Sequence, residues 1–297
     1  MNNNNDYAIV AEGLTKQFGD FIATNHITFQ VHRGEIFGFL GANGAGKTTA
    51  MRMLCGLSRP TDGHATVAGF DVYREAEMVK KNIGYMSQKF SLYDDLTVYE
   101  NLRLFGGIYG MSTKTIKEKT TLLLKELGFE SERNTMVGSL PLGWKQKLAF
   151  SLSIFHDPKI VFLDEPTGGV DPVTRRQFWE LIYQATDRGI TIFVTTHYMD
   201  EAEYCDRVSI MVDGKIEALD TPAELKRKYF APEGELFKKR ESLVQPIQDE
   251  IYNAVKDIAQ NKGFQLILDR ASDSAIIFAS PKIDISNEVL TKLGYSN

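Results

Sequence analysis

The chain has 297 residues, 43% of them apolar and 25% charged, and a formal net charge of −5 at pH 7. A chain of this length can bury a core of its own, and its only two cysteines, Cys55 and Cys205, exclude a disulfide-stapled miniprotein. No run of about 18 apolar residues occurs, so no membrane-spanning helix is expected. The acidic balance, without an extended patch of Lys and Arg, argues against binding of nucleic acid.

The first forty residues have the pattern of β-structure. Apolar and polar side chains alternate over residues 7–40, which predicts antiparallel strands separated by turns. Glu35–Leu40 is a short, mostly apolar run that ends at Gly41, as a buried strand does. Helical spacing follows over Ala50–Leu57. The order of strand, glycine-rich loop and helix is typical of a phosphate-binding unit.

The glycine-rich loop, residues 41–48, matches G-x-x-x-x-G-K-[ST] at every fixed position. Glycines allow backbone N–H groups to surround a phosphate, and the following helix directs its positive end at the same anion. Lys47 is expected to reach the β- and γ-phosphates, and the Thr48 hydroxyl to hold Mg²⁺. The residues predicted here to bind the nucleotide are Gly41, Asn43, Gly44, Ala45, Gly46, Lys47, Thr48 and Thr49.

The middle of the chain reads as helical from residue 92 to residue 138. Thr97 and Glu100 form a capping box that opens one helix. Apolar residues then recur at helical spacing over Ile116–Leu127 and stop at Gly128.

Parallel strands are predicted further along. Ile160–Leu163 and Thr191–Thr195 are apolar or β-branched runs that alternate with helices, which indicates a parallel sheet. A second capping box begins at Thr221, with Pro222 at the first helical position.

Two carboxylates follow the first of these strands. The carboxyl end of a strand in a doubly wound sheet lies beside the phosphate loop, so Asp164 is expected to hold Mg²⁺ through water. Glu165 is then able to face the γ-phosphate and accept a proton from attacking water. His197 ends the second strand, where it can contact the γ-phosphate and orient that water.

Together these residues resemble the ABC ATPase family over about residues 7–228. Lys47 and Asp164 are 117 residues apart, which leaves room for the family's helical subdomain at about 90–155. The resemblance implies an α/β fold, a P-loop NTPase of the ABC type. Its parallel sheet core carries an antiparallel β subdomain and a helical subdomain. It also implies ATP and Mg²⁺ as ligands.

Further roles come from this resemblance alone. Gln88, in Tyr85–Gln88, matches the family's Q-loop, which implies a contact with Mg²⁺ and water and a part in coupling. Asp171, in Gly168–Asp171, matches the D-loop at a dimer interface, and Phe18 matches the aromatic residue that stacks on adenine.

The signature segment departs from the family pattern. Leu140–Gly143 stands where the family usually has Leu-Ser-Gly-Gly, and Pro141 has neither a hydroxyl nor an N–H to offer a phosphate. The N–H groups of Leu142 and Gly143 and a helix amino terminus remain. The Pro-Leu-Gly form is similar to that of drug or antibiotic exporters. We expect reduced but real ATPase activity.

The character of the chain changes near residues 226–236, and residues 229–297 are expected to form a small α+β extension. Residues 237–260 read as a helix with a kink or break at Pro246, followed by strands at 264–269 and 275–279. This order resembles the carboxy-terminal part of the Skp/OmpH family of periplasmic chaperones, without that family's first strand and first long helix.

The function expected from the resemblance is that of the ATP-hydrolysing subunit of an exporter. It implies a second cassette, as a homodimer or a related chain, a separate transmembrane subunit, and a place in the cytoplasm against the membrane. Two alternatives stay open: a soluble, non-transport ABC ATPase, and a fusion whose tail acts as an oligomerisation or chaperone-like module.

Overall fold

The computed structural model describes residues 6–88, 91–231, 234–265, 267 and 284–295. The chain divides into two compact units, Met1–Leu225 and Lys226–Asn297.

The strands are β1 (Tyr7–Phe18), β2 (Phe21–His32), β3 (Ile36–Leu40), β4 (Asp62–Val67), β5 (Phe70–Asp71), β6 (Ile83–Met86), β7 (Ile160–Asp164), β8 (Thr191–Thr196), β9 (Arg207–Val212) and β10 (Lys215–Asp220). The helices are α1 (Lys47–Leu54), α2 (Ala76–Asn82), α3 (Val98–Ile108), α4 (Thr113–Leu127), α5 (Leu142–Ser153), α6 (Pro172–Asp187), α7 (Pro222–Phe230), α8 (Glu235–Lys262) and α9 (Ser286–Lys292). Two 3₁₀ turns are η1 (Val137–Ser139) and η2 (Met199–Tyr204).

The first unit contains two sheets, as expected for this α/β fold. Four strands form a sheet in the order β2-β1-β4-β5, and its pairs are antiparallel. Six strands form the other sheet in the order β10-β9-β3-β8-β7-β6. Within it β6, β7, β8, β3 and β9 run parallel, and β10 pairs antiparallel with β9. Strands β3, β7 and β8, which carry the predicted site residues at their carboxyl ends, are therefore neighbours in this sheet.

Alternate side chains of the six-stranded sheet enter two different cores. Phe37 and Phe39 of β3 and Phe193 of β8 pack with α1 and with Phe29 of β2. The ring centroids of Phe193 and Phe39 are 5.2 Å apart. The intervening residues of the same strands pack against α5 and α6 on the opposite face. Because both faces are covered, the residues of β3 and β8 are buried, and apart from Gly38 they are apolar or β-branched, as the sequence predicted.

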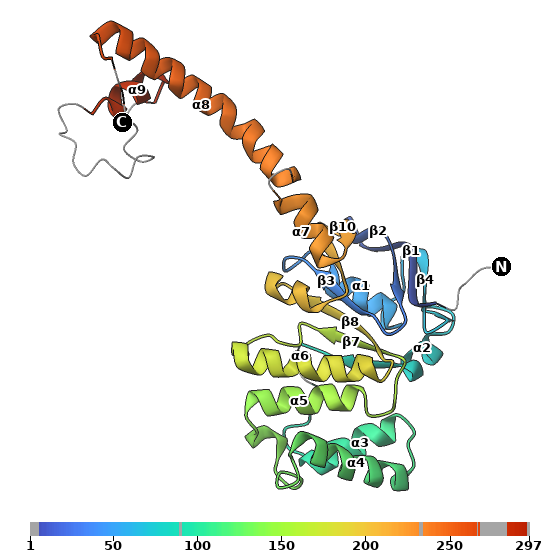
Figure 1. Cartoon of the computed structure of the whole chain (residues 1–297). Coiled ribbons are helices and arrows are strands. Elements are labelled where there is room, and N and C mark those ends of the chain that lie inside the picture. Colours follow the sequence, from blue (N-terminus) through green and yellow to red (C-terminus); the bar gives the residue numbers. More distant parts are fainter. Residues whose placement is uncertain (1–5, 89–90, 232–233, 266, 268–283, 296–297) are drawn as a thin grey trace. The chain divides into compact units, whose positions relative to one another are not determined.

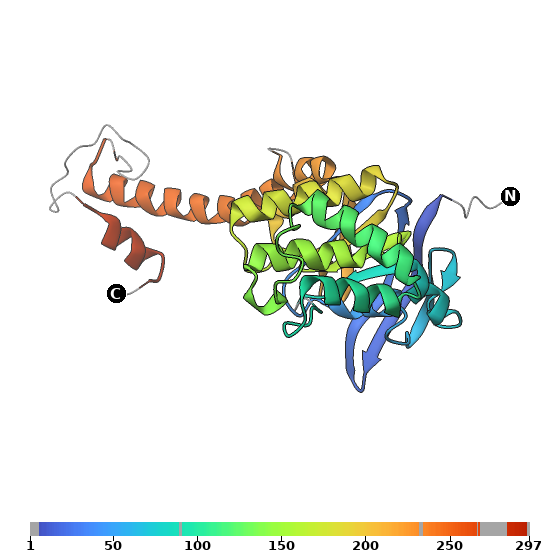
Figure 2. The same cartoon turned by 90° about the horizontal axis from the view of Figure 1, so that it is seen from below.

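A third core belongs to the helical region. It lies among α3, α4 and α5, which gather at the end of the unit away from β1, β2 and β4 (Figure 1). The same green helices stand in front of the strands in Figure 2. The capping box at Thr97 is present, and α4 ends at Gly128, which has a φ of 69°. The helical interpretation of residues 92–138 was too broad, because residues 129–136 between α4 and η1 are not helical.

The second unit contains α8 and α9. Ala254 and Ile258 of α8 are buried against Val289 of α9. The expected break at Pro246 is absent, because α8 continues through it. Of the two predicted strands, 275–279 lies outside the described residues, and of 264–269 only Phe264, Gln265 and Ile267 are described. None of the helices in the described ranges is both long and apolar enough to cross a membrane.

Candidate nucleotide site

The phosphate loop connects β3 to α1. Gly44 and Gly46 have φ values of 85° and 101°, a backbone region that residues with a side chain rarely adopt. A Cβ on Gly46 would also lie 2.1 Å from the carbonyl oxygen of Ala23. Gly46 therefore needs to be glycine both for its backbone conformation and for the close approach of a neighbouring strand.

Lys47 crosses the inside of this loop. Its side chain is nearly buried, and its ammonium donates to the carbonyl oxygens of Gly41 at 2.7 Å and Ala42 at 3.0 Å. The same nitrogen lies 3.6 Å from Oε1 of Glu165. The loop thus holds a positive charge beside the carboxylate of Glu165, the residue that directly follows β7.

Asp164 is the last residue of β7 and is buried. Its Oδ1 accepts from the hydroxyl of Thr195 at 2.7 Å and from that of Thr48 at 3.3 Å. Thr195 was not predicted as a site residue. It is paired with Asp164 in the β7–β8 register, which a strand alignment could have indicated.

Glu165 has a positive φ of 46°, an uncommon and strained value for a residue with a side chain. Its N–H is held by both the carbonyl and the hydroxyl oxygen of Thr195, each at 3.1 Å. Its Oε2 accepts from Nε2 of Gln88 at 3.1 Å and lies 3.2 Å from Nδ1 of His197. One carboxylate therefore contacts Lys47, Gln88 and His197, three residues that the sequence had placed in this site.

The remaining candidates lie outside this cluster of contacts. Phe18 is 54% exposed at the end of β1, and the Lys16 ammonium lies over its ring, 5.1 Å from the centroid. Asp171 is the N-cap of α6 and accepts from the N–H groups of Val173 and Thr174. Hydrogen bonds from the hydroxyl and N–H of Thr174 lower the pKa of Asp171.

The signature segment forms a helix start despite its altered sequence. Pro141 is the N-cap of α5, and its carbonyl accepts from the N–H groups of Trp144 and Lys145. Leu142 follows and is 47% exposed. Gly143 packs closely against Thr174 of α6. The helix amino terminus survives the loss of serine, which keeps an anion-attracting end available.

Buried polar residues that the sequence analysis did not single out support the site from behind. Gln146 of α5 is completely buried and donates to the carbonyl of Pro166, the residue after Glu165. Glu201 of η2 is also completely buried and accepts from the hydroxyl of Thr167. Gln146 is 20 residues from Pro166 in sequence, and Glu201 is 34 residues from Thr167. No local sequence pattern therefore identifies these hydrogen bonds.

The donor set fits a nucleotide with a hard cation. Thr48, Asp164 and Gln88 offer the oxygen ligands that Mg²⁺ prefers. The glycine-lined loop and the Lys47 ammonium provide what polyphosphate oxygens require.

The chain matches two family models. The one described as "ABC transporter" matches residues 24–168. The one described as "Outer membrane protein (OmpH-like)" matches residues 214–293, which agrees with the resemblance seen in the tail.

Two curated relatives are similar to this chain over 218 and 219 residues. The probable multidrug ABC transporter ATP-binding protein YbhF of Escherichia coli K12 is 51% identical over 73% of this chain. The Nod factor export ATP-binding protein I of Rhizobium sp. strain N33 is 42% identical over 73% of this chain and 72% of its own length. The match covers only 38% of YbhF's length.

Among solved structures, that of a dimeric bacterial ABC transporter cassette has a TM-score of 0.65 and 25% identity. It covers 72% of this chain and 98% of that cassette.

Proposed function

Because this chain belongs to the family of ABC transporter ATP-binding proteins, we propose that it binds and hydrolyses ATP as the energy subunit of an exporter. The observation that carries the proposal is the Glu165 carboxylate, which contacts Lys47, Gln88 and His197 beside the phosphate loop. A base, a cation for phosphate and two groups able to orient water are thereby brought within one small volume.

In this proposal the ammonium of Lys47 exchanges its two carbonyl contacts for oxygens of the β- and γ-phosphates. Thr48, Asp164 and Gln88 hold Mg²⁺, which neutralises charge on the phosphate oxygens. Thr195 keeps Asp164 oriented through their 2.7 Å hydrogen bond. The exposed ring of Phe18 stacks on the adenine.

Proton transfer is assigned to Glu165. Its Oε2 accepts the proton of an attacking water, and His197 and Gln88, both within 3.2 Å of that oxygen, fix the direction of its lone pairs. The two hydrogen bonds that the N–H of Glu165 donates to Thr195 hold the strained backbone that aims the carboxylate. The base is thus pre-oriented before the nucleotide arrives.

A second cassette completes the site in this proposal. The N–H groups of Leu142 and Gly143 face the γ-phosphate of the partner copy, and Asp171 lies at the same interface. Support comes from the dimeric cassette that this chain resembles in fold and from the intact amino terminus of α5.

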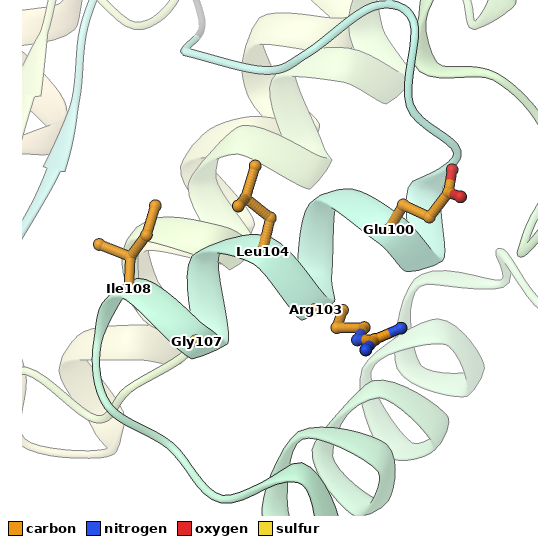
Figure 3. Close-up of a pocket in the computed structure, with 5 residues that line it drawn as sticks. All are labelled: Glu100, Arg103, Leu104, Gly107 and Ile108. Carbon is orange, nitrogen blue, oxygen red and sulfur yellow. The ribbon is translucent and has the colours of Figure 1, made fainter.

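A separate transmembrane subunit is proposed as the mechanical partner, which places the chain at the cytoplasmic face of a membrane. Helix α3 offers an apolar surface for it: Leu104 and Ile108 are 36% and 65% exposed and point to the same side of the helix. Glu100, Arg103 and Gly107 line the same shallow pocket (Figure 3). The exporter assignment follows the name of the Nod factor export ATP-binding protein I of Rhizobium.

We assign residues 7–228 to the ATPase and residues 229–297 to an appended module. The OmpH-like match of residues 214–293 favours a second candidate role for that module, an oligomerisation or chaperone-like one. Removal of residues after 228 is expected to leave Mg²⁺-ATP binding intact if the two parts work separately.

The test is ATP hydrolysis by the purified chain. Glu165→Gln is expected to keep ATP binding and to lose roughly 10²- to 10⁴-fold in rate, because the amide cannot accept the proton. Lys47→Ala is expected to lose tight binding of ATP. Fast hydrolysis by the Gln variant, or no turnover by the wild type above it, would refute the proposal.

A further inference from the structure

A carboxylate of η2 is buried behind the two segments that carry Glu165 and His197. Glu201 in η2 is 0% exposed. Its Oε1 accepts from the hydroxyl of Thr167 and its Oε2 from that of Thr196 at 2.5 Å. Both threonines are buried too.

The two threonines stand next to the proposed catalytic pair. Thr167 follows Glu165 by two residues, and Thr196 directly precedes His197. Glu201 therefore joins the end of β7 to the end of β8 at the point where Oε2 of Glu165 and Nδ1 of His197 lie 3.2 Å apart. The spacing of that pair depends on how these two chain segments are held.

A cation from α6 completes the arrangement. Nε of Arg175 lies 3.5 Å from Oε1 of Glu201, and its Nη1 donates to Asp200 at 3.1 Å. The guanidinium also lies over the ring of Tyr198, 4.3 Å from its centroid. Tyr198 in turn packs on His197, with ring centroids 4.2 Å apart. Arg175 thus contacts both the carboxylate and the aromatic neighbour of His197.

Burial of a carboxylate is costly unless it is paired and fully hydrogen-bonded, and an apolar group of similar size often serves stability as well. The arrangement of Glu201 with Thr167, Thr196 and Arg175 is therefore better explained by the geometry that it imposes on the ends of β7 and β8 than by a gain in stability. Hydrogen-bonded groups behind metal ligands act in this way in other sites, where their loss costs 10- to 100-fold in metal affinity or activity.

We propose that Glu201 is a positioning residue of the ATPase site, which sets the distance between Glu165 and His197 through Thr167 and Thr196. The proposal rests on the function proposed above. Loss of the Glu201 carboxylate should change the rate of the chemical step. It should leave the phosphate loop, and hence the affinity for ATP, unchanged.

The test uses three variants of the full chain, Thr167→Val, Thr196→Val and Glu201→Gln. Thr120→Val is the matched control, because Thr120 is equally buried in α4 and its hydroxyl has no hydrogen-bond partner in the described residues. The three variants are expected to lose about 10- to 100-fold in kcat, with KM and the Kd for a fluorescent ATP analogue within about twofold of the wild type. The control is expected to match the wild type in all three.

Hydrogen exchange of the nucleotide-free chain gives a readout other than activity. Amides of residues 164–170 and 195–204 should exchange faster in the three variants, and those of the phosphate loop, 41–49, should not. A merely structural role would instead raise exchange throughout the unit and weaken ATP binding together with kcat.

The inference is overturned if the three variants keep kcat within about twofold of Thr120→Val, or if kcat falls only in step with ATP affinity and general exchange. A wild-type chain no faster than Glu165→Gln would instead refute the proposed function, and the exchange pattern would still report on the geometry.

Discussion

Gly143 and Thr174 approach so closely that a Cβ on Gly143 would lie 2.9 Å from Cγ2 of Thr174. Thr174 also donates its hydroxyl to Oδ2 of Asp171 at 2.5 Å. The start of α5 and the first turn of α6 are therefore packed against each other, and a side chain at Gly143 would press on the threonine that hydrogen-bonds Asp171. The proposed γ-phosphate contact and the proposed dimer contact form one surface.

Gly143→Ala should destabilise the chain by about 1 kcal/mol, because overpacking outweighs the helix-forming gain of alanine. Gly107→Ala is the matched control, since a Cβ on Gly107 of α3 meets no atom within 4 Å. It should stabilise by about 0.5–1 kcal/mol. Urea unfolding measures both, and an equal stability of the two variants would contradict the close packing.

The dimer is tested by sedimentation of Glu165→Gln with and without Mg²⁺-ATP. A monomer that becomes a dimer with ATP is expected, because the retained N–H groups of Leu142 and Gly143 can still bind the γ-phosphate. The double variant Lys47→Ala, Glu165→Gln is the control and should stay monomeric. An ATP-independent trimer would point to the tail, and no association at all to an unlike partner cassette.

The charge of Asp171 should make the stability of α6 depend on pH in the acidic range. Its folded-state pKa lies below the usual 3.8, because Thr174 hydrogen-bonds the charged form. The stabilisation is therefore complete above 3.8 and is lost as the pH falls through the lower folded value. Asp171→Asn keeps a capping oxygen but removes the charge. Thermal unfolding from about pH 7 to pH 2 should show the gap between wild type and variant closing in acid. A difference in unfolding temperature that stays constant with pH would exclude the charge of Asp171 as its cause.

The aromatic core should dominate the stability of the first unit. Phe193 is fully buried, and its ring lies within 5.7 Å of those of Phe37, Phe39 and Phe162. Phe193→Ala is expected to cost about 3–5 kcal/mol in the free energy of unfolding. Phe21→Ala, at a ring that is 62% exposed, should stay within about 0.5 kcal/mol. Similar losses from both would contradict the burial argument.

The tail shows where a local rule fails. Proline removes one helical hydrogen bond and crowds the preceding turn, which favoured a break at Pro246. Helix α8 nevertheless continues through it, because the hydrogen bonds on either side of the proline keep the 28-residue helix intact. A single unfavourable residue is weak evidence against a helix of this length.

The amino-acid sequence by itself determined the phosphate loop, the carboxylates Asp164 and Glu165, and the strand-ending His197. Each depends on a short run of residues whose chemistry and spacing need no knowledge of distant contacts. It also determined the capping box at Thr97 and the end of α4 at Gly128, because hydrogen bonds at helix ends join near neighbours.

Only the tertiary structure decided which groups share one carboxylate. Gln88 is 77 residues from Glu165 in the chain, and Thr167 is 34 from Glu201. Contacts of this kind depend on the register of β7 against β8 and on the paths of the loops that follow. They form because the burial of whole strands decides which strands lie next to each other in the sheet. A local sequence pattern does not contain that information.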